Sequence, residues 1–281
     1  MTTHQITETA LAAFAGALRR EERSQGTIDK YLRDVRAFSA WLGGETVTKE
    51  RASAWKAALL ADGLSPATVN AKIAAVNHFF TCAGWPGLRL RPLRLQRKLF
   101  RDDRRDLTRA EYDRLVAAAE ALGRGRLALL LEAICATGIR VSEVQYLTVE
   151  AARQGRAEIH LKGKVRVILI PGKLRKKLLG YAKEKKIASG EIFLTRGGKS
   201  LSRKQIWAEM KALCKTAGVS SSKVFPHNLR HLFARTFYQV CRDVAKLADV
   251  LGHSSIETTR IYLISTGAEH ARQLERLGLV S

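Results

Sequence analysis

Acidic residues, cysteines and long apolar stretches are all scarce in this sequence of 281 residues. The 26 acidic residues stand against 49 lysines and arginines, and a net charge of +23 costs self-repulsion unless a polyanion is the partner. The four cysteines are far apart and include no CxxC pair, so reduced thiols in a cytosolic protein are expected. No uncharged apolar stretch approaches the roughly 20 residues of a membrane span, and the N-terminus lacks a secretion signal. We therefore expect a cytoplasmic protein with no membrane partner.

The abundant residue types point to nucleic acid as the partner. A basic excess of this size is typical of proteins that bind nucleic acid, with an acidic membrane surface as the second candidate. Hydrophobic residues make up 46% of the chain, which is enough for well-packed cores. The length fits one large domain or two ordinary ones.

Helical patterns separated by short breakers fill residues 1–88. Gly43-Gly44 stops one helix, and Ser65-Pro66 begins another with an N-cap residue followed by proline in the first turn. The expected helices are 5–22, 27–42, 48–61 and 65–83. Residues 1–88 are therefore predicted to form a small four-helix domain.

Residues 86–106 break this pattern with two prolines and eight basic residues. We place a basic interdomain linker at 89–106 and a second domain at 107–281. Charge alone leaves two interpretations of the linker open: a solvated tether, or a segment that lies along phosphates.

The second domain is predicted to be mostly helical, with one small antiparallel sheet. Thr108-x-x-Glu111 makes a capping box for its first helix, and a buried helix follows at 127–137. Residues 157–170 change to the two-residue period of a β-hairpin, and 192–195 is expected to add a third strand. Helices return from Ser202 and dominate to the end. The predicted fold class is mainly α.

Two polar segments stand where helices begin, and each is suited to an anion. Gly138 ends one helix, so Arg140 falls in the first turn of the next, with Glu143 three residues on to orient it. Further along, His227 and Arg230 share one face of a helix, and this pair is suited to clamping a phosphate. Each segment alone is also typical of a surface ion pair or a capped helix.

A third segment places a histidine and a tyrosine around one helix start. Ser254-x-x-Glu257 predicts a capping box, so His253 precedes the helix and Tyr262 lies about two turns into it. The Lys162-Gly163-Lys164 turn of the hairpin can project an ammonium group into a neighbouring groove.

Together these segments resemble the tyrosine recombinase, or phage integrase, family. The matching stretches are ATGIRVSE, LKGK, HNLRH and LGHSS, followed by a tyrosine nine residues after the last histidine. Their order and intervals match the family, and so does a helical domain joined by a linker to a mostly helical one. The likeness is greatest to compact two-domain members such as Xer-like recombinases and small element-borne integrases.

The resemblance implies a site-specific recombinase or integrase that cuts and rejoins DNA through a 3′-phosphotyrosyl intermediate. Arg140 and Arg230 would clamp the non-bridging oxygens of the scissile phosphate, while His227 and His253 would add hydrogen bonds in the transition state. Tyr262 would be the nucleophile that attacks phosphorus. Free tyrosine has a pKa near 10, so a cationic cluster of this kind would favour its phenolate.

The general acid is less narrowly defined. Lys162 matches the family spacing and would protonate the leaving 5′-oxygen, but Lys164 lies in the same turn and stays open as the alternative. Glu143 would support Arg140 or the histidines without reacting. His231 is expected either to support the site or to face DNA.

The family also implies an architecture and partners. Residues 1–88 would be a SAM-like core-binding domain, and 107–281 would be the catalytic domain. The tail, 266–281, would dock on a neighbouring protomer or pack on its own domain. Double-stranded DNA would be the substrate, bound by a homotetramer on two recombination sites, with room for accessory proteins. Further DNA contacts are expected at Asn70, Lys72, Arg97, Lys98, Arg101, Lys164, Arg166, Arg203 and Lys204.

No cofactor and no metal are expected for this chemistry. Arginines can supply the charge neutralisation that phosphoryl transfer needs, and the phosphotyrosyl bond would conserve the energy of the cut link. Two alternatives remain beside the recombinase: a type IB topoisomerase-like enzyme, and a catalytically silent DNA-binding regulator. A zinc site at His227, His231 and His253 is disfavoured because the ligand spacing is absent.

Overall fold

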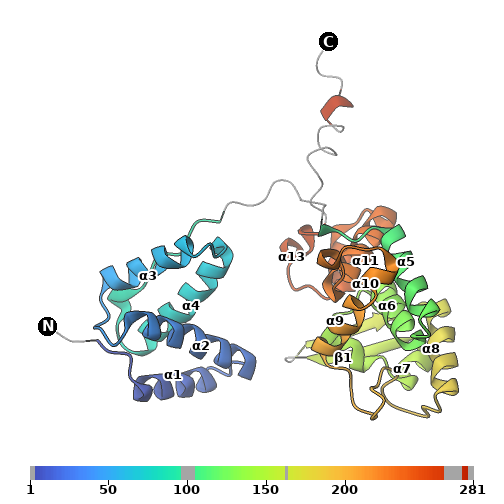
Figure 1. Ribbon diagram of the computed structural model, residues 1–281, viewed down its shortest axis with the longest axis horizontal. Helices are drawn as coiled ribbons and strands as arrows, with labels where there is room; N and C mark the ends of the chain where they lie inside the picture. Colours follow the sequence, from blue (N-terminus) through green and yellow to red (C-terminus); the bar gives the residue numbers. More distant parts are fainter. Residues whose placement is uncertain (1–3, 96–104, 162–163, 263–273, 278–281) are drawn as a thin grey trace. The chain divides into compact units, whose positions relative to one another are not determined.

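The computed structural model describes residues 4–95, 105–161, 164–262 and 274–277. The chain divides into two compact units, residues 1–97 and 98–281 (Figure 1). Both units are built mainly of helices, and one antiparallel strand pair belongs to the second unit. The predicted mainly helical fold is therefore confirmed. None of the helices that the structure describes combines the length and the apolar character of a membrane span.

Four helices and a short 3-10 turn make up the first unit. They are α1 (Glu8–Arg20), α2 (Gln25–Leu42), α3 (Lys49–Ala61), α4 (Pro66–Cys82) and η1 (Pro86–Leu88). Thr7, Thr48 and Ser65 cap three of the helix starts with their hydroxyl oxygens, as their residue types favour. Aromatic rings fill the core, where Phe38 meets both Trp55 and Phe80.

The segment after η1 belongs to this unit because two asparagines of α4 hold it. The amide of Asn77 both accepts from the backbone nitrogen of Leu90 (2.7 Å) and donates to its carbonyl (2.8 Å). Asn70 brackets Leu93 in the same way, at 2.7 and 2.9 Å. Leu90 is buried against the core. The basic segment that the sequence assigns to a linker is thus attached to the first unit through Leu93.

The second unit is arranged around one apolar helix, α6 (Gly125–Thr137), which packs against α5 (Arg109–Ala121), α8 (Gly172–Glu184) and α11 (Pro226–Cys241). Figure 1 shows these helices grouped around it. The part of this unit that the structure describes also contains η3 (Val141–Tyr146), α7 (Val149–Gln154), α9 (Arg203–Lys211), α10 (Cys214–Ala217), η4 (Ser221–Lys223), α12 (Val244–Leu251) and α13 (Ile256–Arg260). Thr108 and Glu111 form the expected capping box at the start of α5.

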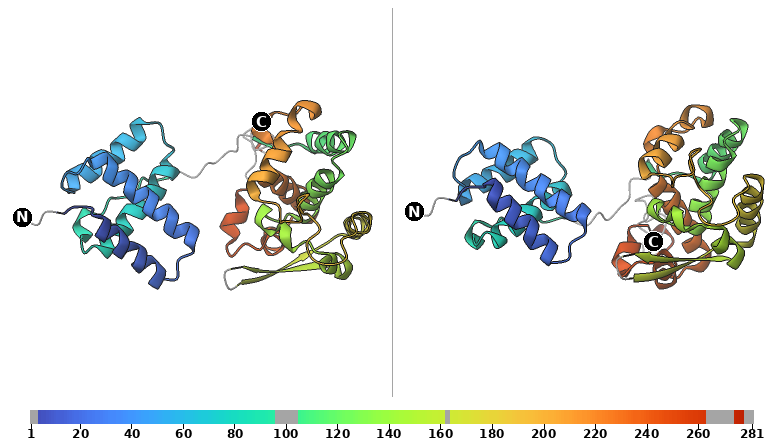
Figure 2. Two further views of the ribbon diagram at one scale, coloured as in Figure 1. Left: turned by 60° about the horizontal axis from the view of Figure 1, so that its bottom comes forward. Right: turned by 90° about the horizontal axis from the view of Figure 1, so that it is seen from below.

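The predicted hairpin is present as β1 (Arg156–Leu161) and β2 (Lys164–Leu169), paired from Arg156↔Leu169 to Leu161↔Lys164. It lies on the same side of the unit as α12 and α13 (Figure 2). The third strand expected at 192–195 does not form. Glu191 and Leu194 each make a single isolated bridge, to Thr148 and Ser200, while Ile192 and Phe193 are buried in the core. The apolar residues at 192–195 therefore serve to pack the core, and they do not form the hydrogen-bond ladder of a strand.

Two local predictions are corrected at the site. Arg140 does not lie inside an α-helix but is the N-cap of the 3-10 helix η3, in extended conformation. The cap of α13 is Ser255, one residue later than expected, and the helix ends at Arg260. Tyr262 therefore follows this short helix in a turn, instead of lying two turns inside it.

Candidate active site

Arg230 lies at the centre of the polar cluster and is only 2% exposed. Its guanidinium donates to the carbonyl of Gly138 at the end of α6, to that of Leu251 at the end of α12 (2.7 Å), and to Nε2 of His253 (2.9 Å). Burial and the neighbouring Arg140 lower the pKa of Arg230 to about 10, although a hydrogen bond with Tyr262 works in the opposite direction. Arg230 therefore joins two helix ends while keeping its charge at neutral pH.

Gly138 is required where α6 ends beside this arginine. Its φ of +63° is in the left-handed region. A Cβ at this position would lie 2.3 Å from Cδ1 of Phe233 on α11. The glycine thus allows α6 and α11 to approach closely and turns its carbonyl toward Arg230.

Glu143 is buried and binds two arginines at once. One carboxylate oxygen accepts from Arg140 (2.8 Å) and the other from Arg166 (2.8 Å). The backbone nitrogen of Arg140 also donates to Glu143, at 2.8 Å. The other terminal nitrogen of the Arg140 guanidinium donates to the carbonyl of Gly252 at 3.4 Å. The side chain of Arg140 remains 41% exposed, so an anion can reach it from solvent. The contact between Arg140 and Glu143 is the one expected from their spacing.

Arg166 takes a role that sequence reasoning missed. The sequence predicts a DNA contact, whereas the structure places its guanidinium in the internal pair with Glu143 and on the carbonyl of Val250 (2.9 Å). Burial is the main cause that lowers the pKa of Arg166. A signal was available, because Arg166 shares the inward face of β2 with the buried Ile168 and, two residues further, Ile170.

Tyr262 lies among three histidine rings. Its ring centroid is 4.4 Å from that of His231, 5.8 Å from His253 and 6.0 Å from His227. The residue is only 3% exposed and packs with Leu247 and Leu251 of α12. His231 meets Tyr262 edge to face, so it supports the tyrosine ring directly.

Both flanking histidines favour the neutral form. Partial burial, Arg230 and Arg140, together with two weaker neighbours, lower the pKa of His253 to about 4. The same three causes lower the pKa of His227, which is an exposed residue. His253 is held on two sides, because Nδ1 lies 2.8 Å from the hydroxyl of Thr259 and Nε2 meets Arg230.

The remaining predicted residues are distributed differently. Lys162, Arg97, Lys98 and Arg101 lie outside the described residues, and of Lys164 only the backbone in β2 is described. Asn70 uses its amide to hold Leu93, and Lys72 pairs with the buried Asp34 at 3.4 Å. Arg203 and Lys204 are exposed at the start of α9.

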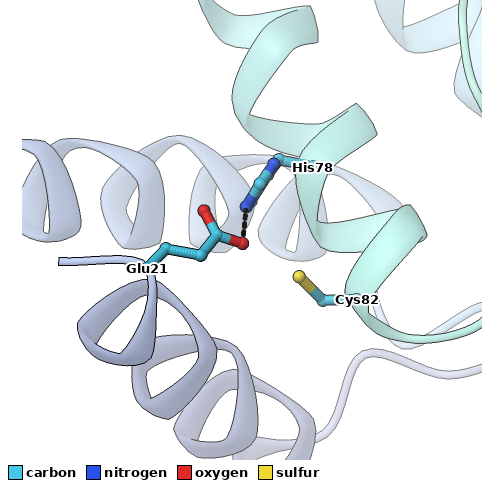
Figure 3. Close-up of side chains that lie close together, drawn as sticks. All are labelled: Glu21, His78 and Cys82. Atoms are coloured by element: carbon cyan, nitrogen blue, oxygen red, sulfur yellow. Dashed lines mark hydrogen bonds and ion pairs between the residues drawn. The ribbon is translucent and has the colours of Figure 1, made fainter. Parts of the chain in front are cut away.

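The first unit contains three side chains that are of metal-ligating types and lie close together. Glu21, His78 and Cys82 each offer a ligand atom, and these atoms lie within 4.8 Å of one another (Figure 3). His78 Nε2 contacts Glu21 Oε1 at 2.9 Å, and burial together with Glu21 raises the pKa of the Cys82 thiol. An ordinary histidine–glutamate pair accounts for this arrangement without an ion.

The cluster in the second unit suits a phosphate that carries developing charge. Arg140, Arg166 and Arg230 supply three cations against the one carboxylate of Glu143, and a tyrosine lies beside them. A positive site of this kind stabilises the negative charge that develops on a phosphate in the transition state. It brings together five of the six predicted catalytic residues, with Lys162 outside the described part of the chain.

Known protein families show the same organisation. Residues 105–269 match the phage integrase family, and residues 11–87 match the phage integrase N-terminal SAM-like domain. The chain belongs to the phage integrase family of tyrosine recombinases. This recombinase is 32% identical over 262 residues to tyrosine recombinase XerC of Roseiflexus castenholzii, which covers 85% of this chain and 83% of that protein. It is 31% identical to tyrosine recombinase XerA of Thermococcus kodakarensis, over 91% and 90% of the two chains.

Solved structures of two integrases share the fold of this recombinase. The Tn1549 transposon integrase in complex with transposon right end DNA matches with a TM-score of 0.73 at 18% identity, over 96% of this chain and 99% of that one. A lambda integrase dimer bound to a core site also matches with a TM-score of 0.73, at 19% identity, over 92% and 77%. The family resemblance inferred from the motifs is confirmed, and with it the assignment as a site-specific tyrosine recombinase.

Proposed function

We propose that this recombinase cuts and rejoins double-stranded DNA through a covalent bond from Tyr262 to the 3′ phosphate. The observation that carries the proposal is the position of the Tyr262 ring, which lies beside Arg230 and among His227, His231 and His253. Phosphoryl transfer is mostly a matter of positioning and charge stabilisation, and this cluster offers both around one phenol.

The roles follow from exposure and charge. Arg140 is the guanidinium open to solvent, so it meets the phosphate first, and Arg230 joins the clamp by turning donors from its present partners toward the non-bridging oxygens. The phenol oxygen of Tyr262 attacks phosphorus, and its proton passes to a neutral histidine beside the ring. The bond to the 5′-oxygen breaks, and Lys162 supplies the proton to that leaving group, with Lys164 as the alternative donor. Reversal of these steps rejoins the strand.

No cofactor enters this scheme. The phosphotyrosyl bond replaces one phosphodiester bond with another of similar energy, so rejoining draws on no nucleotide. Three arginines around one carboxylate supply positive charge that a divalent metal would otherwise bring.

The partner and the domain roles are part of the proposal. Integrases of the same fold were solved on DNA as a dimer and as a tetramer on a Holliday junction. We infer that this recombinase likewise binds double-stranded DNA and forms a tetramer on two sites. Residues 1–88 would grip the core site, 89–106 would follow the backbone, 107–281 would carry the chemistry, and 266–281 would dock on a neighbour. A DNA substrate and four free cysteines fit a cytoplasmic setting.

Trapping the covalent complex between protein and DNA tests this proposal. The protein is first incubated with genomic fragments, and sequencing the ends attached to it reports the target. A nicked DNA substrate with that target sequence then traps the complex. The wild-type protein should give a protease-sensitive DNA adduct, and Tyr262→Phe should bind the same DNA without forming one. An adduct that survives in Tyr262→Phe would reject the assignment of the nucleophile.

A further inference from the structure

Thr259 is a buried polar residue that the proposed reaction does not use. It is the penultimate residue of α13 and is fully buried. Its hydroxyl oxygen lies 2.8 Å from Nδ1 of His253, and its carbonyl accepts from the backbone nitrogen of Tyr262 at 3.0 Å. One residue therefore contacts both a histidine of the site and the proposed nucleophile.

The hydrogen-bond partners of His253 determine which ring nitrogen carries the proton. Arg230 Nη2 lies 2.9 Å from Nε2, and a guanidinium nitrogen can only donate. Nε2 must therefore be the acceptor in this pair and carries no hydrogen. A neutral imidazole has its single hydrogen on the other nitrogen. Nδ1–H then donates to the hydroxyl oxygen of Thr259, which lies 2.8 Å away on that side of the ring.

The charges around the ring agree with the neutral form. Arg230, Arg140 and Arg166 all disfavour a second proton on His253, and they come from α11, the start of η3 and β2 respectively. His227 is the other titratable group that acts on the ring. The resting ring is thus uncharged, and its tautomer is set by Arg230 on one side and Thr259 on the other.

We propose that Thr259 is a positioning residue that holds His253 in the Nδ1–H tautomer, so that Nε2 faces the reacting phosphate. Before DNA enters, Nε2 accepts from Arg230. When a phosphate draws Arg230 away, its negative charge favours uptake of a solvent proton at Nε2, which then donates to a phosphate oxygen. The Nδ1–H bond to Thr259 is present in both states, so the ring keeps its orientation throughout. The role in catalysis rests on the proposed function of His253. The tautomer of His253 in the protein without DNA does not, and it can be tested separately.

Isosteric substitution separates the hydroxyl from the shape of the side chain. Thr259→Val keeps the branched shape and removes the acceptor, while Thr259→Ser keeps the hydroxyl. Thr258→Val is the matched control, because this neighbouring threonine on the same helix is exposed. Removing the outer hydrogen-bond partner of a metal-ligating histidine typically costs about 10-fold to 100-fold in activity. By analogy, we expect Thr259→Val to slow adduct formation by a factor of the same order. Thr259→Ser and Thr258→Val should stay within about threefold of the wild type.

Nitrogen NMR of the DNA-free protein shows which ring nitrogen of each histidine carries a hydrogen, which an activity assay does not. The chain contains seven histidines, and the His253→Gln variant identifies the His253 signals. The wild type, Thr259→Ser and Thr259→Val should all show an unprotonated Nε2, because Arg230 donates to it in each. Only Thr259→Val should show a shifted Nδ1–H signal, because that hydrogen has lost its acceptor. A wild-type ring protonated at Nε2 overturns the inference whether or not the enzyme cleaves DNA. An unchanged Nδ1–H signal together with an unchanged rate in Thr259→Val also overturns it.

Discussion

Glu143 offers the clearest test of how the site is held together. In the Glu143→Gln variant the side chain keeps its length and loses its charge, while Arg140 and Arg166 keep theirs. The two pairs differ in exposure, since the side chain of Arg140 is 41% exposed and that of Arg166 is 11% exposed. Water can solvate the charge of Arg140 when Glu143 is neutralised. Most of the lost stability therefore comes from the buried charge of Arg166.

The magnitude follows from this burial. Removing one partner of a buried ion pair costs about 3–5 kcal/mol, because the other charge stays buried without compensation. The pair with Arg140 adds about 0.2–1 kcal/mol at most, as expected for a half-exposed pair. For a unit of this size, 1 kcal/mol shifts the melting temperature by about 2–4 °C. We therefore expect Glu143→Gln to lower it by about 6–24 °C.

Urea unfolding together with hydrogen exchange measures the loss of stability in the second unit, to which Glu143 belongs. Exchange of peptides from α6 and α11 reports the second unit alone, which matters because two units need not unfold together. Glu184→Gln is the control, since that glutamate on α8 is 67% exposed and pairs with its neighbour Lys185. A loss below about 1 kcal/mol in Glu143→Gln would show that the buried charge is not needed to hold the two arginines.

Three further predictions concern the acid, the salt dependence and the pH dependence. Lys162→Ala should be inactive on ordinary DNA and recover on a substrate with a 5′-phosphorothiolate leaving group, because sulfur leaves without a proton; recovery confined to Lys164→Ala would make Lys164 the acid instead. DNA affinity, measured by fluorescence anisotropy, should fall with salt at a log–log slope of about −0.9 per phosphate neutralised, and a flat response would count against extended contact with the backbone. The pKa of His253 is about 4 in the folded protein and about 6.5 when unfolded. The unfolded chain therefore takes up this proton first, so the stability contributed by neutral His253 is present above pH 6.5 and lost as the pH falls toward 4. His253→Asn should show a smaller loss over this range than the exposed-site control His160→Gln, and equal losses would refute the assignment.

The helices and the order of the site residues could be predicted because their signals are local. Caps such as Thr108 with Glu111, and the apolar run of α6, act within a few residues. The motif positions around Arg140, Arg230 and His253 likewise depend on short spacing. These are the parts of the fold in which neighbouring residues decide the conformation.

Contacts between distant segments could not be predicted in the same way. Asn70 looked like a polar side chain free to meet DNA, but it brackets Leu93, which is 23 residues away. Arg166 looked like one more basic residue of a hairpin, but from β2 it pairs with Glu143 on η3. In each case the partner lies far along the chain, and a single sequence does not state which distant groups will meet.

The short helix before the nucleophile shows a third kind of difference. The sequence predicts a longer helix through Tyr262, whereas α13 ends at Arg260 and Tyr262 occupies a turn. The ring is then free to leave the helix axis and pack against Leu247 and Leu251 among the histidines. Tertiary packing decides this end of the helix, and local propensity does not.

Peptide mapping of the trapped covalent complex tests the central claim most directly. After the DNA is digested to a short remnant, mass spectrometry identifies the residue that carries it. We predict a single modified peptide with the nucleotide on Tyr262 and attached through its 3′ phosphate. A remnant on any other residue, or attachment through the 5′ phosphate, would contradict the proposed chemistry.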